Sequence, residues 1–211
     1  MYTRAFWDKI YKKHFSDAPW MSEEWARGGI RLLDNYIPES PQNGCLLDYG
    51  CGNALISDHF MQKGYKIELA DISDELVNWL QARHDDSVPI YLVDSPDMIL
   101  GESKYDYVLA WGLFHHINPN LWETFLDSFC RLMKKNALLF VSGWDDSDEI
   151  LKKEKKLGRY TQQPVWYINM LGDMLDWRKD TFEIMESKIV PFRLKPFTKK
   201  RMIRFIEAKK K

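Results

Sequence analysis

Short apolar runs alternate with amphipathic stretches through the middle of the chain. Within an amphipathic stretch, apolar side chains recur at the three- and four-residue spacing of a helix. The run at residues 137–142 is apolar up to its final serine, which is typical of a strand buried on both faces of a parallel sheet. The pattern predicts strands at residues 45–49, 65–70, 88–93, 105–111 and 137–142, and helices at residues 53–63, 73–83 and 119–133. This alternation indicates a doubly wound α/β sheet with helices on both faces.

The two ends of the chain break this alternation. Before it, residues 6–15 are expected to form a helix, and Ser22 is a suitable N-cap for a second helix that runs to about Ile37. After it, residues 182–190 and 201–208 are expected to be strands joined by a short loop, so that they can pair antiparallel. The ends therefore predict a helical N-terminal part and a C-terminal strand pair beside the α/β core.

Composition places few restrictions on this picture. The 211 residues fit one domain, and a net charge of −1 supplies no broad attraction to nucleic acid or to an anionic membrane. No stretch approaches the ~18 apolar residues of a membrane span, and the first residues do not resemble a signal peptide. The three cysteines form no paired pattern. We therefore expect a cytoplasmic protein without a membrane partner, either a monomer or a homodimer.

The strongest chemical signal is a glycine turn between the first core strand and the helix after it. Gly50 and Gly52 follow the apolar strand directly, and glycine lets the backbone turn tightly and approach a ligand closely. Asp71 closes the next strand about twenty residues later, where a carboxylate can bind the hydroxyl groups of a ribose. A dinucleotide fingerprint would place a third glycine at Leu55, which argues against NAD. The pattern favours a different cofactor that contains a nucleoside.

The segment Asp48-x-Gly50-x-Gly52-x-Ala54 resembles the first motif of class I S-adenosylmethionine-dependent methyltransferases, with Ala54 in place of that family's third glycine. The resemblance continues in order through the five core strands, although the family's usual Pro-Gly-Gly turn before the fifth strand is absent. It implies a Rossmann-like, mostly parallel seven-stranded sheet whose last strand is antiparallel. It also implies S-adenosylmethionine as the cofactor and S-adenosylhomocysteine as the product.

The same resemblance assigns contacts to the cofactor. Asp71 would hold the ribose, and Ile72 would touch the adenine ring. Asp94, with Ser95 beside it, would bond the adenine amino group, and Trp111 would border the methyl group. The implied cofactor-binding set is Asp48, Gly50, Gly52, Asp71, Ile72, Asp94, Ser95 and Trp111.

Most of these residues also have an interpretation without a ligand. The glycines can form a tight turn alone, Asp48 can satisfy the amides of that turn, and Asp71 can be a solvated strand end. Asp94 can cap a helix, and Asp97 is a rival for its role. The cofactor interpretation therefore depends on the ordered set rather than on any single residue.

Two adjacent histidines are the candidate catalytic residues. His115 and His116 follow the fourth strand, at the edge where ligands bind in open α/β sheets. Either one can orient or deprotonate the methyl acceptor, because histidine titrates near neutral pH. The alternative is a packed or capping histidine. Neither this pair nor Cys45 and Cys51 has the spacing of metal ligands, so no metal site is expected.

Aromatic side chains dominate the candidate acceptor site. Nine tryptophans are many for a chain of this length, and such rings can line a pocket for an apolar or cationic acceptor. They can equally pack as core under the added helices, and Asp145 can be a charge at a helix N-terminus. The candidate acceptor-binding residues are Trp7, Tyr11, Trp20, Trp144, Asp145 and Trp166.

The resemblance implies methyl transfer by in-line displacement to an oxygen, nitrogen or sulfur atom. A small-molecule acceptor is expected because the chain has no room for a target-recognition domain. A nucleic-acid or protein methyltransferase is one alternative, although the fourth strand leads into Ala110-Trp-Gly-Leu, which does not match the acceptor motif of many base methylators. A cofactor-binding scaffold without catalysis is the other. The expected organisation is a single domain with a helical lid (1–44), a cofactor core (45–143), a helical acceptor-side segment (144–181) and the final strand pair (182–211).

Overall fold

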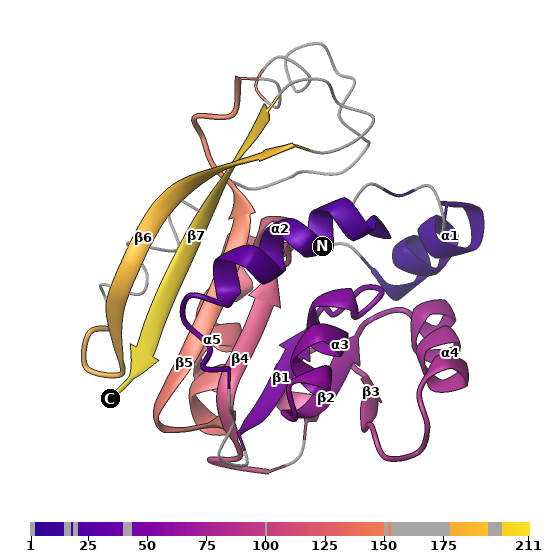
Figure 1. Cartoon of the computed structure of the whole chain (residues 1–211), viewed down its shortest axis with the longest axis horizontal. Coiled ribbons are helices and arrows are strands. Elements are labelled where there is room, and N and C mark those ends of the chain that lie inside the picture. Colours follow the sequence, from indigo (N-terminus) through magenta and orange to yellow (C-terminus); the bar gives the residue numbers. More distant parts are fainter. Residues whose placement is uncertain are drawn as a thin grey trace.

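The computed structural model describes residues 3–14, 18, 21–39, 44–99, 101–149, 152, 178–193 and 200–211. Its centre is a seven-stranded sheet in the order β3-β2-β1-β4-β5-β7-β6 (Figure 1). The strands are β1 (Cys45–Tyr49), β2 (Lys66–Asp71), β3 (Ile90–Leu92), β4 (Tyr105–Trp111), β5 (Met133–Trp144), β6 (Phe182–Arg193) and β7 (Lys200–Lys210). The helices are α1 (Arg4–His14), α2 (Glu23–Leu33), α3 (Leu55–Gln62), α4 (Asp74–Arg83) and α5 (Trp122–Leu132).

The strand pairing confirms the predicted sheet. β1 pairs in parallel with β2 and β4, β2 with β3, and β4 with β5. β7 pairs antiparallel with both β5 and β6, so that the last strand alone runs against the others. The chain winds outward from β1 to β3 and then returns to start β4 on the other side of β1. This reversal of strand order creates a switch point at the carboxyl ends of β1 and β4, where open α/β sheets bind ligands.

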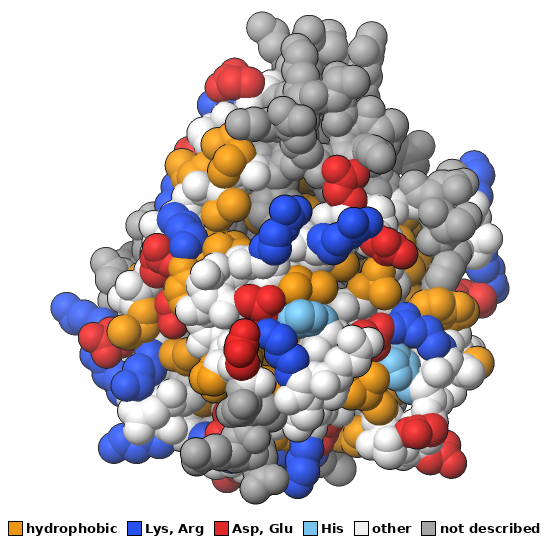
Figure 2. Space-filling view, viewed as in Figure 1, with side chains coloured by type: hydrophobic (Ala, Val, Ile, Leu, Met, Phe, Trp, Pro, Cys, Tyr) orange, Lys and Arg blue, Asp and Glu red, His pale blue; other side chains and the backbone are white. Residues whose placement is uncertain are grey.

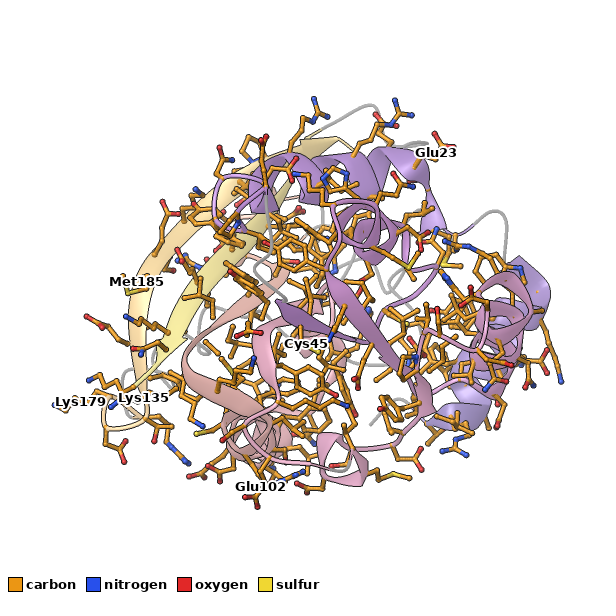
Figure 3. The ribbon with its side chains drawn as sticks, turned by 60° about the horizontal axis from the view of Figure 1, so that its bottom comes forward. Glu23, Cys45, Glu102, Lys135, Lys179 and Met185 are labelled. Carbon is orange, nitrogen blue, oxygen red and sulfur yellow. The ribbon has the colours of Figure 1, made fainter. Side chains whose placement is uncertain are left out.

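Two apolar layers cover the sheet, one on each face. Side chains of α2, α3 and α4 contribute to the first layer, and side chains of α5 contribute to the second. Neighbouring residues of β5 alternate between them, since Phe140 belongs to the first and Leu139 to the second. Figure 3 shows side chains filling the space on both sides of the sheet around Cys45. The core strands are therefore buried on both faces, as their continuous apolar runs predict.

The element bounds differ from the predicted ones where distant pairing or local capping decides them. β5 is longer than predicted at both ends, because Met133 pairs with Tyr105 of β4 and β7 pairs with β5 as far as Trp144. The helix expected to reach Ile37 ends at Leu33, although its predicted N-cap is correct: the Ser22 side chain accepts a hydrogen bond from the Trp25 amide. The helix expected at residues 119–133 begins with a 3-10 turn before α5. No helix in these described segments is long and apolar enough to cross a membrane.

Candidate functional site

The glycine turn lies at the carboxyl end of β1, beside the switch point. Gly50, Gly52 and Ala54 have positive φ angles of 75°, 53° and 56°. A Cβ atom on Gly50 would lie 2.9 Å from Leu113 Cδ1, so this position requires glycine for two reasons. Ala54 adopts a left-handed conformation that costs an L-residue about 1–2 kcal/mol, and it is the position where the resembled motif has its third glycine. The backbone of this loop is therefore held in a conformation that its sequence only partly favours.

Asp71 ties the end of β2 to the glycine turn. One oxygen of its carboxylate accepts the Gly52 amide at 3.3 Å, and the other accepts the Ser73 amide at 3.1 Å. The side chain is buried, and burial raises the pKa of Asp71 to about 6 despite these hydrogen bonds. The structure thus brings two predicted cofactor-binding residues, Asp71 and Gly52, into direct contact. Ile72 comes directly after Asp71, before α4 begins, and its side chain is half-buried.

Asp48 is buried behind the turn. The Ser57 hydroxyl on α3 donates to its carboxylate at 2.6 Å. Burial, with a smaller contribution from the negative charge of Asp71, raises the pKa of Asp48 to about 7 despite the Ser57 hydrogen bond. Asp48 is therefore partly protonated near neutral pH, and its observed partner is a side chain of the neighbouring helix.

Asp94 and Ser95 follow β3 at the same edge of the sheet. The Asp94 carboxylate is about half exposed and accepts a hydrogen bond of 3.0 Å from the Arg4 guanidinium of α1. Ser95 Oγ accepts the Asp97 amide at 3.4 Å. Asp97, the rival for the role of Asp94, receives the Ser128 hydroxyl of α5 instead. Of the two acids, Asp94 is thus the one that faces α1.

Trp111 ends β4 on the other side of the switch point. Its buried indole lies 6.1 Å from the Trp25 ring of α2 and 6.4 Å from the Phe205 ring of β7. Gly112 then turns the chain with φ of 69°, and its amide donates to both the carbonyl (3.1 Å) and the hydroxyl (3.0 Å) of Ser142. Trp111 is therefore fixed in place by α2, by β7 and by the turn that follows it.

The two histidines lie in the 3-10 turn after β4. Their rings are 3.9 Å apart; His115 lies 5.6 Å from the Trp144 ring, and His116 lies 5.0 Å from the Trp7 ring. Burial lowers the pKa of His116 to about 3. A neutral imidazole with so low a pKa is a weak general base, but it can still orient an acceptor through hydrogen bonds.

The predicted acceptor-side residues separate into three groups. Trp7 and Tyr11 stack at 6.0 Å on α1, with Trp7 against His116. Trp144 ends β5 beside His115.

The carboxylate of Asp145 is buried. It accepts a hydrogen bond of 2.7 Å from Arg204 Nε of β7, and it also accepts hydrogen bonds from the amide and the hydroxyl of Ser147. Despite its burial, the Ser147 hydrogen bonds and the Arg204 charge hold the pKa of Asp145 below its usual value. Trp20 and Trp166 lie outside the described residues.

Several residues of this site escaped sequence reasoning. Arg4 and Asp8 of α1 contact the loops that follow β3 and β2, and Trp25 of α2 packs on Trp111. Arg4 and Asp8 are four residues apart on one helix face, but this spacing does not reveal which distant loops they contact. Among the described residues, no group of three or more His, Cys, Asp or Glu could hold a metal ion.

Comparison with known proteins agrees with this architecture. A ubiquinone biosynthesis O-methyltransferase of Pelagibacter ubique is 25% identical over 159 residues, which span 64% of this chain and 65% of that protein. The structure of a 1,6-didemethyltoxoflavin-N1-methyltransferase of Burkholderia thailandensis, with bound 1,6-didemethyltoxoflavin and S-adenosylhomocysteine, has a TM-score of 0.73 at 19% identity, covering 98% of this chain and 86% of that chain.

A magnesium protoporphyrin IX methyltransferase of Synechocystis PCC 6803, with bound S-adenosylhomocysteine, has a TM-score of 0.73 at 15% identity, covering 99% of this chain and 97% of that chain. At these identities the two structures show a shared fold. The methyltransferase-domain family itself matches residues 18–179, about three quarters of the chain. The chain belongs to this family, and the resemblance to class I S-adenosylmethionine-dependent methyltransferases is thereby confirmed.

Proposed function

We propose that this methyltransferase binds S-adenosylmethionine at the carboxyl ends of β1, β2 and β3 and transfers its methyl group to an oxygen, nitrogen or sulfur atom of a small molecule. The contact between Asp71 and Gly52 carries the proposal, because it sets a buried carboxylate against a left-handed glycine turn at the switch point. The similar proteins support the acceptor class, since their names refer to ubiquinone biosynthesis, a toxoflavin precursor and a porphyrin.

The residues present fit this cofactor. Gly50 and Gly52 hold the turn in a left-handed conformation that a side chain would strain, and this turn would seat the methionine part together with Asp48. Asp71 would accept the ribose hydroxyls. The adenine ring would lie between Ile72 and the pair Asp94 and Ser95, and Trp111 would border the methyl group.

The bound cofactor supplies a methyl group on a positively charged sulfur. Transfer of this methyl group would leave S-adenosylhomocysteine, and the proton lost from the acceptor atom would pass to solvent. The protein must hold the acceptor in line and exclude water. Trp7, Trp144 and the two histidines would do this, with His116 orienting the acceptor as a neutral imidazole rather than removing its proton. We further propose that residues 1–44 act as the lid of this site.

The alternative functions have less support. A nucleic-acid substrate would require an extended basic surface, whereas Figure 2 shows Lys and Arg interspersed with Asp and Glu on the face it presents. A non-catalytic scaffold would bind the cofactor in the same way, so only turnover against candidate acceptors separates it from an enzyme. The three cysteines are free, which supports a reducing compartment such as the cytoplasm.

Calorimetric titration with S-adenosylmethionine and S-adenosylhomocysteine tests the cofactor. We expect Asp71→Ala to weaken binding by about 2 kcal/mol, roughly 30-fold, because ribose hydroxyls would lose a buried acceptor. Asp85→Asn is the matched control, since Asp85 is an exposed acid whose bonds go to Ser87. Its affinity should match the wild type. A folded wild type that binds neither ligand would refute the proposed function.

The pH dependence of the same titration tests the charge of Asp71. Its pKa of about 6 means that the carboxylate is ionised above pH 6 and protonated below it. Ribose hydroxyls donate to the ionised form, so wild-type affinity should be full at pH 7.5 and fall as the pH drops through 6. Asp71→Asn should bind weakly at every pH. Asp48→Asn should keep the wild-type decline near pH 6, which separates Asp71 from the second buried acid.

A further inference from the structure

We propose that Arg4 is a positioning residue for the adenosine site: from α1 it holds the Asp94 carboxylate in place, so that docking of α1 and binding of the cofactor favour each other. The inference rests on the proposed function, because it takes Asp94 as the acid that meets the adenine. It goes beyond that function by making the N-terminal helix responsive to whether the cofactor is bound.

Arg4 joins the two loops that would hold adenosine. Its Nη2 lies 3.0 Å from Asp94 Oδ2, in the loop after β3. Its Nη1 lies 3.8 Å from Asp74 Oδ2, at the first residue of α4 and three residues beyond Asp71. A single guanidinium thus spans the ends of β2 and β3, and a change at either loop is transmitted to α1.

Asp8, one helical turn along α1, strengthens the same connection. The Ser73 hydroxyl donates to Asp8 Oδ1 at 2.6 Å, and the Glu75 amide donates to it at 3.3 Å. The Ser73 amide in turn donates to Asp71. A continuous set of hydrogen bonds therefore runs from α1 to the residue that would hold the ribose. Figure 1 shows α1 beside α4, as these contacts require.

The strength of the Arg4 contact depends on what covers it. The Arg4 side chain is 31% exposed and that of Asp94 is 52% exposed. Ion pairs with this exposure contribute little in water, because solvent screens them. A ligand lying over the two loops would exclude water and strengthen the pair. The Arg4 Nε–H group is buried and has no hydrogen-bond partner among the described residues.

An adjacent face of α1 extends the effect toward the acceptor. Trp7 packs edge-to-face on His116 at 5.0 Å, in the turn after β4. When Arg4 and Asp8 dock α1, they therefore also fix the position of the Trp7 ring, which would border the acceptor. Because linked equilibria are reciprocal, a cofactor that favours docked α1 would complete this wall before the acceptor enters.

Binding of S-adenosylhomocysteine to full-length variants tests the proposal. Arg4→Ala should weaken the affinity about 5- to 10-fold, and Arg4→Lys should recover part of it because the charge remains. In an Asp94→Ala background, Arg4→Ala should have less than about 2-fold further effect. Lys12→Ala is the matched control, since Lys12 pairs with Glu75 at 2.7 Å between the same two helices without reaching Asp94. Its affinity should stay within about 2-fold of the wild type.

Hydrogen exchange supplies a readout that a purely structural role of Arg4 would not move. Bound S-adenosylhomocysteine should slow exchange of the α1 amides in the wild type and in Lys12→Ala, and much less in Arg4→Ala. Unchanged or tighter binding by a folded Arg4→Ala would overturn the proposal, and tighter binding would mean that Arg4 competes with the cofactor for Asp94. A folded wild type that binds no S-adenosylhomocysteine would overturn the proposed function and this inference together, whereas normal wild-type binding with an unaffected Arg4→Ala overturns the inference alone.

Discussion

The first two helices are equal in length but attached to the protein in opposite ways. α1 and α2 have eleven residues each. α2 buries Ala26, Gly29 and Leu33 in the apolar layer over the sheet. α1 places Tyr11 among the buried residues of that layer, with Trp7 packed against it only partly buried, and it holds the loops after β2 and β3 through polar contacts.

This difference separates a permanent part of the fold from a part that can move. Apolar burial stabilises by roughly 25 cal/mol per Å² and is not screened by salt. Exposed ion pairs contribute about 0–1 kcal/mol each and are screened. α1 can therefore detach from its loops in a local opening while α2 opens only with the core. Within the proposed lid of residues 1–44, α1 would be the part that moves and α2 its fixed base.

A side chain introduced at Gly29 tests how closely α2 packs on the layer beneath it. A Cβ atom there would lie 2.8 Å from Ile56 Cδ1 and 3.1 Å from Trp111 Cε2. The Ile56 methyl can rotate away, but the Trp111 indole is confined between neighbouring rings. We expect Gly29→Val to lower the free energy of unfolding by about 2 kcal/mol in urea denaturation, because it overfills a packed site.

Gly28 supplies the control on the same helix. It is only half-buried, and Gly28→Ala should raise stability by up to about 1 kcal/mol because alanine favours the helix. Wild-type stability for Gly29→Val would mean that α2 also yields, and the contrast between the two helices would be lost.

The polar attachment of α1 is tested by removing the Asp8 carboxylate, which accepts hydrogen bonds from Ser73 and Glu75 at the start of α4. Asp8→Ala should cost about 1 kcal/mol, the usual value of a lost N-cap acceptor. The loss should appear as faster hydrogen exchange in α1, with global unfolding little changed, because Ser73 still caps α4 through the Leu76 amide. Asp8→Asn keeps an acceptor oxygen and should be milder. A global loss of more than about 2 kcal/mol would show instead that α1 is part of the cooperative core.

The fold could be predicted from local patterns because most of its elements are determined locally. The strand at residues 105–111 and the cap at Ser22 match the structure, since each depends on a few adjacent residues. The full length of β5 could not be predicted, because its last residues pair with β7 about sixty residues later. Local sequence does not encode how far such a ladder continues.

The candidate site divides in the same way. The turn at Gly50 and Gly52 and the acid at Asp71 could be placed together, because the carboxyl ends of neighbouring parallel strands meet at one edge. The contacts of Arg4 with Asp94 and of Asp145 with Arg204 could not. A charged side chain on a helix or strand has many possible partners of opposite sign, and only the assembled fold selects one.

Salt should distinguish the two helices with the smallest perturbation. Raising NaCl from about 0.1 to 1 M shortens the screening length from about 10 to 3 Å, which weakens exposed pairs such as Arg4–Asp94 and Lys12–Glu75. Amides of α1 should then exchange about 3-fold faster, whereas those of α2 should not speed up, because salt does not weaken apolar burial. The control is Arg4→Ala combined with Lys12→Ala, whose α1 should respond little. No response in α1 would mean that the Trp7 and Tyr11 rings hold it in place, and an equal response of both helices would mean that salt acts on the whole fold. Either result would leave the Arg4 pair with little influence on the lid.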